Sequence, residues 1–314
     1  MSSGVSAQIA VPGSAPAYPA KAVRVICPNG VGDTADILAR LIGVKVGERL
    51  GRQFIIDNRA GAAGQLGLEL AARAAPDGYT ISMGQGTNLA IVPHTYKTLR
   101  YDPLKDFASI AVVATSYSAL VVHPGTPFKS IKELIAYGRA NPNKLIAASG
   151  SELGFQHLSF ELLRMQSGAR FVHVPYKGSA AIVSDLISGQ VDLSMSSYTA
   201  FAPHIRSGRM RLLAITNPTR VALLPNTPAL AEFVPGYDMR GWYGFVAPAA
   251  VPREIITLLN TEINRATAQP DVREKLHLAG LDIPSEPPEY FADLMKRESA
   301  KFGKLVRDAG LTPQ

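Results

Sequence analysis

The sequence predicts an α/β protein, and three observations support that prediction. Short runs of β-branched and aliphatic residues recur along the chain, and most are followed by a loop rich in Gly, Ser, Thr or Asn and then by a helical pattern. The composition, 46% hydrophobic and 18% charged, is globular and excludes a disordered or coiled-coil chain. At about 100–200 residues per domain, the 314 residues indicate two domains or one large one.

The N-terminal part is predicted to contain strand–loop–helix units. The β-branched run 23–26 precedes a Gly-rich loop, and the helix predicted at 34–50 carries an apolar residue at every fourth position, which gives it one hydrophobic face. A strand at 54–56 leads to a helix at 64–75, which the turn Pro76-Asp77-Gly78 ends. Further strands are expected at 79–83, 110–113 and 119–122.

The rest of the chain continues the alternation and ends in helices. Ser130 and Glu133 form a capping box at the start of a helix at 130–140, and Gly168 ends a helix at 154–167. The remaining elements are strands at 145–148, 171–174, 191–193 and 211–215, and helices at 180–188, 252–268, 270–279 and 287–309.

The charge, the cysteine content and the N-terminal residues exclude several kinds of partner and site. Lys and Arg number 32 against 25 Asp and Glu, but they are scattered, so we expect no nucleic-acid partner. No apolar run approaches the roughly 20 residues of a membrane span. The single cysteine, Cys27, excludes an internal disulfide and a Cys-rich zinc site. Residues 1–17 lack the basic start of an intact signal peptide and are interpreted as a tail or the remnant of a leader.

Four strand-to-helix junctions share a chemistry that suits anions. In open α/β sheets, ligands bind outside the carboxyl ends of the strands, where helix N-termini present unpaired N–H groups. Such a junction can hold a carboxylate or a phosphate. The alternative for each is a plain helix cap, because Ser, Thr and Asp are favoured there. The junctions lie at 28–34, 84–88, 149–154 and 175–180.

The first junction also matches a dinucleotide-binding fingerprint. Gly30, Gly32 and Ala35 fit G-x-G-x-x-G/A, and Asp57 ends the next strand, where an acid that binds ribose would lie. This favours an NAD-dependent oxidoreductase as an alternative function. However, three residues separate the strand from the first Gly, whereas a Rossmann turn is tight. We interpret Asp33 as a helix N-cap.

Nothing in the sequence forms a convincing catalytic or metal-binding set. The chain has no G-x-S-x-G, H-E-x-x-H or Walker motif, and no His, Asp and Glu cluster with metal-ligand spacing. His157 and His173 are interpreted as packing residues. We therefore expect no enzyme activity, no metal and no cofactor.

An ordered set of motifs runs from about Tyr18 to the C-terminus and resembles the Bug family, the periplasmic solute-binding proteins of tripartite tricarboxylate transporters. The motifs are Pro28 to Gly32 with Asp36-Ile37-Leu38-Ala39-Arg40, Asp57-Asn58-Arg59 with Gly61-Ala62-Ala63-Gly64, Ala75-Pro76-Asp77-Gly78-Tyr79-Thr80, the segment 101–107, the segment 172–180, Pro203-His204-Ile205, the segment 224–228 and Trp242-Tyr243-Gly244.

The resemblance implies a type II periplasmic binding protein. Two lobes, each a mostly parallel sheet flanked by helices, would close on a ligand in the cleft between them. Lobe 1 would comprise 18–117 and 242–314, and lobe 2 would comprise 118–241, with 1–17 as the tail. The protein would be a periplasmic monomer that delivers a small organic acid, either a mono- or dicarboxylate, an aromatic acid or an amino acid, to membrane transporter subunits. A ligand-sensing module for a membrane signalling partner is the alternative.

The resemblance also implies a binding site, with departures from the family pattern. Asp33 stands where the family usually has Gly, Glu152 lies in the third junction, and Ser196 stands where Asp is common. Asp33 or Glu152 could meet an amino group or a proton of the ligand, an aromatic acid could stack near Phe155, Tyr198 or Trp242, or both acids could face solvent. The residues expected to bind the ligand are Asn29, Gly30, Val31, Gly32, Asp33, Thr34, Thr87, Asn88, Ser149, Ser151, Glu152, Gly154, Phe155, Gly178, Ser179, Ala180, Ser196 and Tyr198; Tyr176 and Lys177 are given a supporting role.

Overall fold

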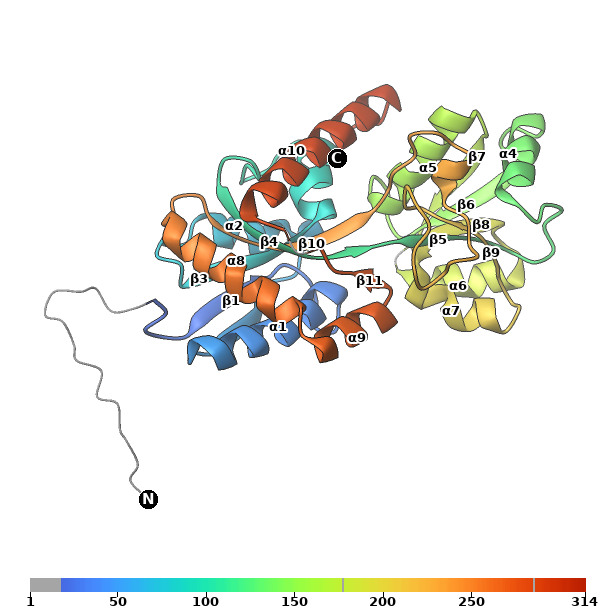
Figure 1. Ribbon diagram of the computed structural model, residues 1–314. Helices are drawn as coiled ribbons and strands as arrows, with labels where there is room; N and C mark the ends of the chain where they lie inside the picture. The colour runs from blue at the N-terminus through green and yellow to red at the C-terminus, as the bar shows by residue number, and fades with distance from the viewer. Residues whose placement is uncertain (1–17, 177, 285) are drawn as a thin grey trace, which may run out of the picture.

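The computed structural model describes residues 18–176, 178–284 and 286–314, so the predicted tail and Lys177 lie outside it (Figure 1). The first of its two sheets has the strand order β11-β4-β10-β3-β1-β2. β1 pairs in parallel with β2 and β3, whereas β10 runs antiparallel to β3 and β4. The strands are β1 (Val23–Cys27), β2 (Phe54–Asn58), β3 (Thr80–Gln85), β4 (Phe107–Ser116), β10 (Gly241–Pro248) and β11 (Leu281–Asp282).

Helices cover both faces of the first sheet. Strand residues alternate between the two faces, so Val25 packs with Leu38 and Ile263 on one side, while Ile26 packs in a cluster with Leu68 and Phe291 on the other. The first face is covered by α1 (Thr34–Leu50), α8 (Arg253–Thr267) and α9 (Pro270–Leu278). The second is covered by α2 (Gln65–Ala72), the short helical turns η2 (Thr87–Ile91) and α3 (Val92–Thr95), and α10 (Pro288–Asp308). A turn η1 (Ala62–Gly64) precedes α2.

The second sheet has the order β7-β6-β8-β5-β9 and is covered in the same way. Leu120 of β5 packs toward α4 and α5, and Val121 packs toward α6 and α7. β6 is parallel to β7 and β8, and β5 is antiparallel to β8 and β9. The elements are β5 (Ser118–Val122), α4 (Ile131–Ala140), β6 (Leu145–Ser149), α5 (Phe155–Ser167), β7 (Phe171–Pro175), α6 (Ser179–Ser188), β8 (Leu193–Ser197), α7 (Tyr198–Arg206) and β9 (Arg211–Ile215).

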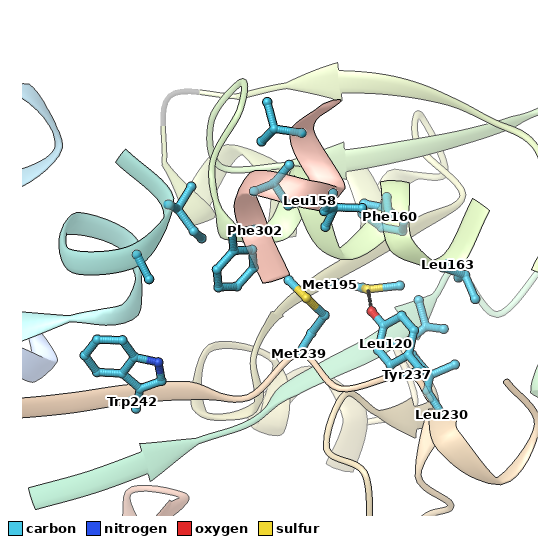
Figure 2. Close-up of a cluster of buried hydrophobic side chains, with 14 of the residues drawn as sticks. Leu120, Leu158, Phe160, Leu163, Met195, Leu230, Tyr237, Met239, Trp242 and Phe302 are labelled. Carbon is cyan, nitrogen blue, oxygen red and sulfur yellow. Dashed lines mark hydrogen bonds between the residues drawn. The ribbon is translucent and has the colours of Figure 1, made fainter. Parts of the chain in front are cut away.

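The chain passes between the sheets twice. β4 ends at Ser116 and β5 begins two residues later; the return runs from β9 through a short turn, η3 (Leu230–Glu232), to β10. One apolar cluster continues across this region: Figure 2 shows Phe302 of α10 beside Leu158 of α5, with Trp242 of β10 further along. The rings of Phe302 and Phe155 meet edge to face at 6.4 Å. The C-terminal helix therefore packs against both halves of the molecule.

The prediction of an α/β protein with two sheet-based lobes is confirmed. The expectation that each sheet is mostly parallel is wrong. Both sheets are mixed, because β10 returns antiparallel to the first sheet between β3 and β4, and β5 enters the second antiparallel between β8 and β9. Sequence patterns identified most helices and strands but missed η2 with α3, α7, η3, β10 and β11. Within the described residues, no helix is both long enough and apolar enough to cross a membrane.

Candidate ligand-binding site

A cleft of about 410 Å³ lies between the two sheets and draws on elements of both. Parallel strands end at the same edge of a sheet. The carboxyl end of β3 therefore lies beside that of β1, where α1 begins, and the carboxyl end of β8 lies beside that of β6, where α5 begins. The residues that line the cleft are Thr34, Ile37, Leu38, Gln85, Gly86, Thr87, Ser116, Tyr117, Ser118, Phe155, Gln156, Ser197, Thr199, Gly241, Trp242, Tyr243, Lys275, Leu276, Ala279, Gly280 and Leu281.

The polar lining is almost entirely neutral. Hydroxyl groups, two side-chain amides and the Trp242 indole supply hydrogen-bond donors. Among the described lining residues there is no Asp or Glu, and Lys275 is the single cation. Burial raises the pKa of Tyr243 despite hydrogen bonding to Thr34 and Ser116, so its phenol stays a neutral donor. Such a cleft can hold an anion through neutral donors.

Three of the predicted site residues line the cleft: Thr34, Thr87 and Phe155. Two further lining residues, Ser197 and Thr199, are the immediate neighbours of the predicted Ser196 and Tyr198. Ser196 is buried and accepts a hydrogen bond from Gln156 Nε2 at 3.3 Å. Fourteen other predicted residues do not line this cleft: Asn29, Gly30, Val31, Gly32, Asp33, Asn88, Ser149, Ser151, Glu152, Gly154, Gly178, Ala180, Ser196 and Tyr198. The side chain of the remaining one, Ser179, lies outside the described part of the structure.

The loop between β1 and α1 already carries its own carboxylates. Asp33 caps the helix, accepting a hydrogen bond from the Thr34 N–H at 3.0 Å, as the sequence predicts. Asp36 accepts the Gly32 N–H at 2.9 Å and the Asn58 amide at 2.9 Å, and pairs with Arg40. Two backbone donors of this predicted anion loop are therefore occupied by the protein itself.

The acid expected to bind ribose in a dinucleotide enzyme is also engaged. Asp57 pairs with Arg24 and with Arg59, each with an N–O distance of 2.9 Å. Burial raises the pKa of Asp57, but the hydrogen bonds from Arg24 and Arg59 outweigh burial and hold that pKa below its usual range. Nothing in this arrangement favours binding of a ribose hydroxyl.

A histidine pair supports the loop between β6 and α5. The rings of His157 and His173 stack with centroids 3.7 Å apart. His157 Nδ1 accepts the Leu153 N–H at 3.0 Å, and His173 Nε2 lies 2.6 Å from the Ser149 hydroxyl. Burial lowers the pKa of His173 to about 4, so this ring is neutral near pH 7. Both histidines pack and position the loop.

The loop between β7 and α6 shares its sheet edge with the loop between β6 and α5. β6 and β7 are parallel, so their carboxyl ends lie side by side. Gly178 precedes α6 with a φ of 107°, a conformation that favours glycine. Gly178 and Ala180 are exposed. Tyr176 donates a hydrogen bond to Asp185 at 2.7 Å, which holds the start of the loop.

Sequence reasoning did not place Tyr117 or Lys275 in the site. Tyr117 follows β4 at the crossing between the sheets, and burial raises the pKa of its phenol. Lys275 belongs to α9, one of the C-terminal helices to which the sequence analysis assigned no role in ligand binding. Among the described residues, no group of three or more His, Cys, Asp or Glu side chains could hold a metal ion.

The sequence and the fold match one family and its solved members. Residues 38–311 match the family described as the tripartite tricarboxylate transporter family receptor. A UPF0065 protein from the tcbD–tcbE intergenic region of Pseudomonas sp. (strain P51) is 37% identical over 92% of this chain and 87% of its own length. Protein BugT of Bordetella pertussis is 32% identical over 97% of this chain and 94% of its own length.

Two solved structures give the same assignment. Rpa4515 of R. palustris with adipate is 34% identical, with a TM-score of 0.82 over 95% of this chain and all of the other. MatC from Rhodopseudomonas palustris with bound malate is 28% identical, with a TM-score of 0.77 over 92% of this chain and all of the other. The chain therefore belongs to the tripartite tricarboxylate transporter receptor family and is a periplasmic solute-binding protein of the Bug type.

Proposed function

We propose that this protein captures a small organic acid between its two lobes and delivers it, chemically unchanged, to the membrane subunits of a tripartite tricarboxylate transporter. The observation that carries the proposal is a cleft between two sheets whose polar lining consists of neutral donors and one lysine. Relatives of the same fold have adipate or malate bound. The protein acts as a monomer and not as an enzyme.

The proposed movement is a closure of the two lobes on each other. Lobe 1 comprises 18–117 and 242–314, and lobe 2 comprises 118–241. A ligand shifts the balance between open and closed forms only if it contacts both lobes in the closed form. Residues Asn29–Asp33, which lead to the cleft residue Thr34, and the loop Gly178–Ala180 are not part of the lining of the described cleft. Closure would bring the backbone donors of these two loops to the ligand, except for the N–H groups of Gly32 and Thr34, which Asp36 and Asp33 already accept.

Thermal unfolding with a panel of carboxylates tests the proposal. A ligand that binds only the folded protein stabilises it by about 2.7 kcal/mol at a concentration of 100 Kd. We expect a saturable rise in the melting temperature with at least one mono- or dicarboxylate and recovery of that acid unaltered. NADH, followed by its fluorescence, serves as the control. Saturable NADH binding, turnover of the acid, or no shift across the panel would contradict the proposal.

A further inference from the structure

The loop between β6 and α5 contains a residue in a conformation that side chains disfavour. Leu153 is buried and has a φ of 55°, in the left-handed region. Its N–H donates to His157 Nδ1 at 3.0 Å, and His157 is only 6% exposed. Such a conformation persists only where the surroundings hold it. The acceptor on His157 therefore helps to fix this loop.

The same loop determines where two residues of the cleft wall lie. Phe155 and Gln156, the first residues of α5, both line the cleft. Gln156 accepts the Gly150 N–H at 3.0 Å and donates to the Ser196 hydroxyl of β8 at 3.3 Å. A change in the loop would therefore shift side chains that face the ligand.

The hydrogen bonds assign the hydrogens of the histidine pair. A neutral imidazole carries one N–H, so His157, whose Nδ1 accepts, has its hydrogen on Nε2. The Ser149 hydroxyl has a single hydrogen, which it donates to the Ser151 carbonyl at 2.8 Å. His173 Nε2, 2.6 Å from that hydroxyl, is therefore the donor to it. A proton that enters His157 can go only to Nδ1, the acceptor of the Leu153 N–H.

The surroundings direct the first proton to His157. The two rings stack with centroids 3.7 Å apart, so a charge on one disfavours a charge on the other. Burial lowers the pKa of His157, but Glu161, 4.0 Å away, and Glu152 oppose that shift and favour the cation. Burial and the neighbouring His157 lower the pKa of His173 to about 4, with no carboxylate to oppose them.

The other titratable groups around the pair are already engaged. β6, β7 and β8 contain no Asp, Glu, Lys or Arg within the bounds that the structure describes. On α5 and the elements packed against it, these groups are Arg164, which pairs with Glu161, Lys301, which pairs with Glu298, and Tyr237, which donates to the Ser159 carbonyl.

We infer that His157 is a positioning residue for ligand binding, and that its protonation at Nδ1 removes the acceptor of the Leu153 N–H, releases the loop and weakens ligand binding. This inference rests on the proposed function and adds that acid promotes release. Because the binding-competent loop requires neutral His157, affinity should be full at pH 7. It should fall as the pH drops through the range in which His157 takes up its proton.

Calorimetric titration with adipate at pH 7 and at about pH 4.5 tests the inference on His157→Asn. The Asn Oδ1 can accept the Leu153 N–H but does not titrate. At pH 7 the variant should bind within about twofold of the wild type, and at the lower pH it should bind about threefold to tenfold more tightly than the wild type. Adipate also takes up protons, so the two proteins are compared at the same pH.

His123→Asn is the matched control. His123 Nδ1 also accepts a backbone N–H, from Gly125 at 3.1 Å, but His123 does not line the cleft. This variant should keep the pH dependence of the wild type. Circular dichroism at each pH checks that all three proteins stay folded. If adipate does not bind the wild type at pH 7, the carboxylate that raises the melting temperature most takes its place.

Hydrogen exchange of the Leu153 amide, followed by NMR, is a readout that needs no ligand. After correction for the intrinsic exchange rate, protection should fall in acid in the wild type and persist in His157→Asn. Equal affinities of these two proteins at both pH values, loss of the pH effect in His123→Asn, or protection that acid leaves unchanged would overturn the inference and leave the proposed function standing. If no carboxylate binds at pH 7, both fail.

Discussion

At the scale of single residues, charge in the loop between β1 and α1 decides how an acid can approach. Asp33 caps α1 and is exposed beside the cleft residue Thr34. A ligand carboxylate near this helix start would meet both the favourable helix N-terminus and an unfavourable fixed negative charge. We therefore expect Asp33 to weaken binding of an acid unless the ligand brings its own proton or amino group.

The substitution Asp33→Asn separates these alternatives. Asn caps a helix as well as Asp does, so α1 is retained while the charge is lost. We expect adipate affinity, measured by calorimetry at low salt, to rise by about twofold to fivefold. Asp293→Asn, at an exposed position of α10, is the matched control and should have no effect. Weaker binding by Asp33→Asn would instead show that Asp33 accepts a hydrogen bond from the ligand.

Asp36 has a structural role that pH should reveal. Burial raises the pKa of this carboxyl, but hydrogen bonds from Arg40, Gly32 and Asn58 outweigh burial and hold that pKa below its usual range. Because the folded protein lowers this pKa, its contribution to stability is present at neutral pH and is lost as the pH falls below about 4.

Urea unfolding of Asp36→Asn tests this role. At pH 7 the substitution should lower the free energy of unfolding by about 1–3 kcal/mol. The donors on Arg40, Gly32 and Asn58 would then face a neutral amide instead of a carboxylate. The difference from wild type should shrink as the pH falls below about 4. Asp293→Asn should unfold like the wild type at each pH. A difference that stays constant with pH would contradict the assigned role.

Sequence patterns could predict caps and glycines at this scale but not which side chains meet in the cleft. Asp33 was identified as an N-cap from its residue type alone. Ser196 was expected in the site because the family resemblance places an Asp there, whereas its neighbour Ser197 lines the cleft. Successive strand residues face opposite sides of a sheet, so the two side chains point to different faces. Lys275 joins the cleft only through tertiary packing of α9.

At the scale of elements, helices with clear stop signals were predicted best. Gly168 ends α5 with a φ of 72°, as the sequence indicates. In contrast, β10 was missed because Gly244 interrupts its apolar pattern. The structure requires that glycine, since a Cβ there would lie 2.5 Å from the Phe291 ring and 2.7 Å from the Ala111 carbonyl oxygen. α7 was not predicted either, because it contains Pro203, a residue that disfavours the interior of a helix.

The end of α5 gives a prediction about stability. Gly168→Ala should lower the free energy of unfolding by about 1 kcal/mol, because alanine is disfavoured in the left-handed conformation. Gly30→Ala is the control, because Gly30 lacks a left-handed φ and a Cβ atom added there would have no heavy atom within 4 Å. Its unfolding, followed by circular dichroism in urea, should match the wild type. Equal stability of Gly168→Ala and wild type would contradict the cap assignment.

At the scale of the whole molecule, two mixed sheets place several strand ends around one cleft. The fold class followed from the alternation of strands and helices, whereas the return of β10 into the first sheet depends on contacts far apart in sequence. α10 packs against both halves through Phe302 and Phe155. Movement of the lobes must therefore preserve or exchange this contact.

The central claim is that an acid binds at these strand ends and leaves unaltered. A crystal structure of the wild-type protein with the carboxylate that raises its melting temperature most tests the claim directly. The account predicts the intact acid between the lobes, in contact with residues from both sheets and with Trp242. An acid bound on one lobe alone, at a separate surface, or found converted to another compound would contradict it.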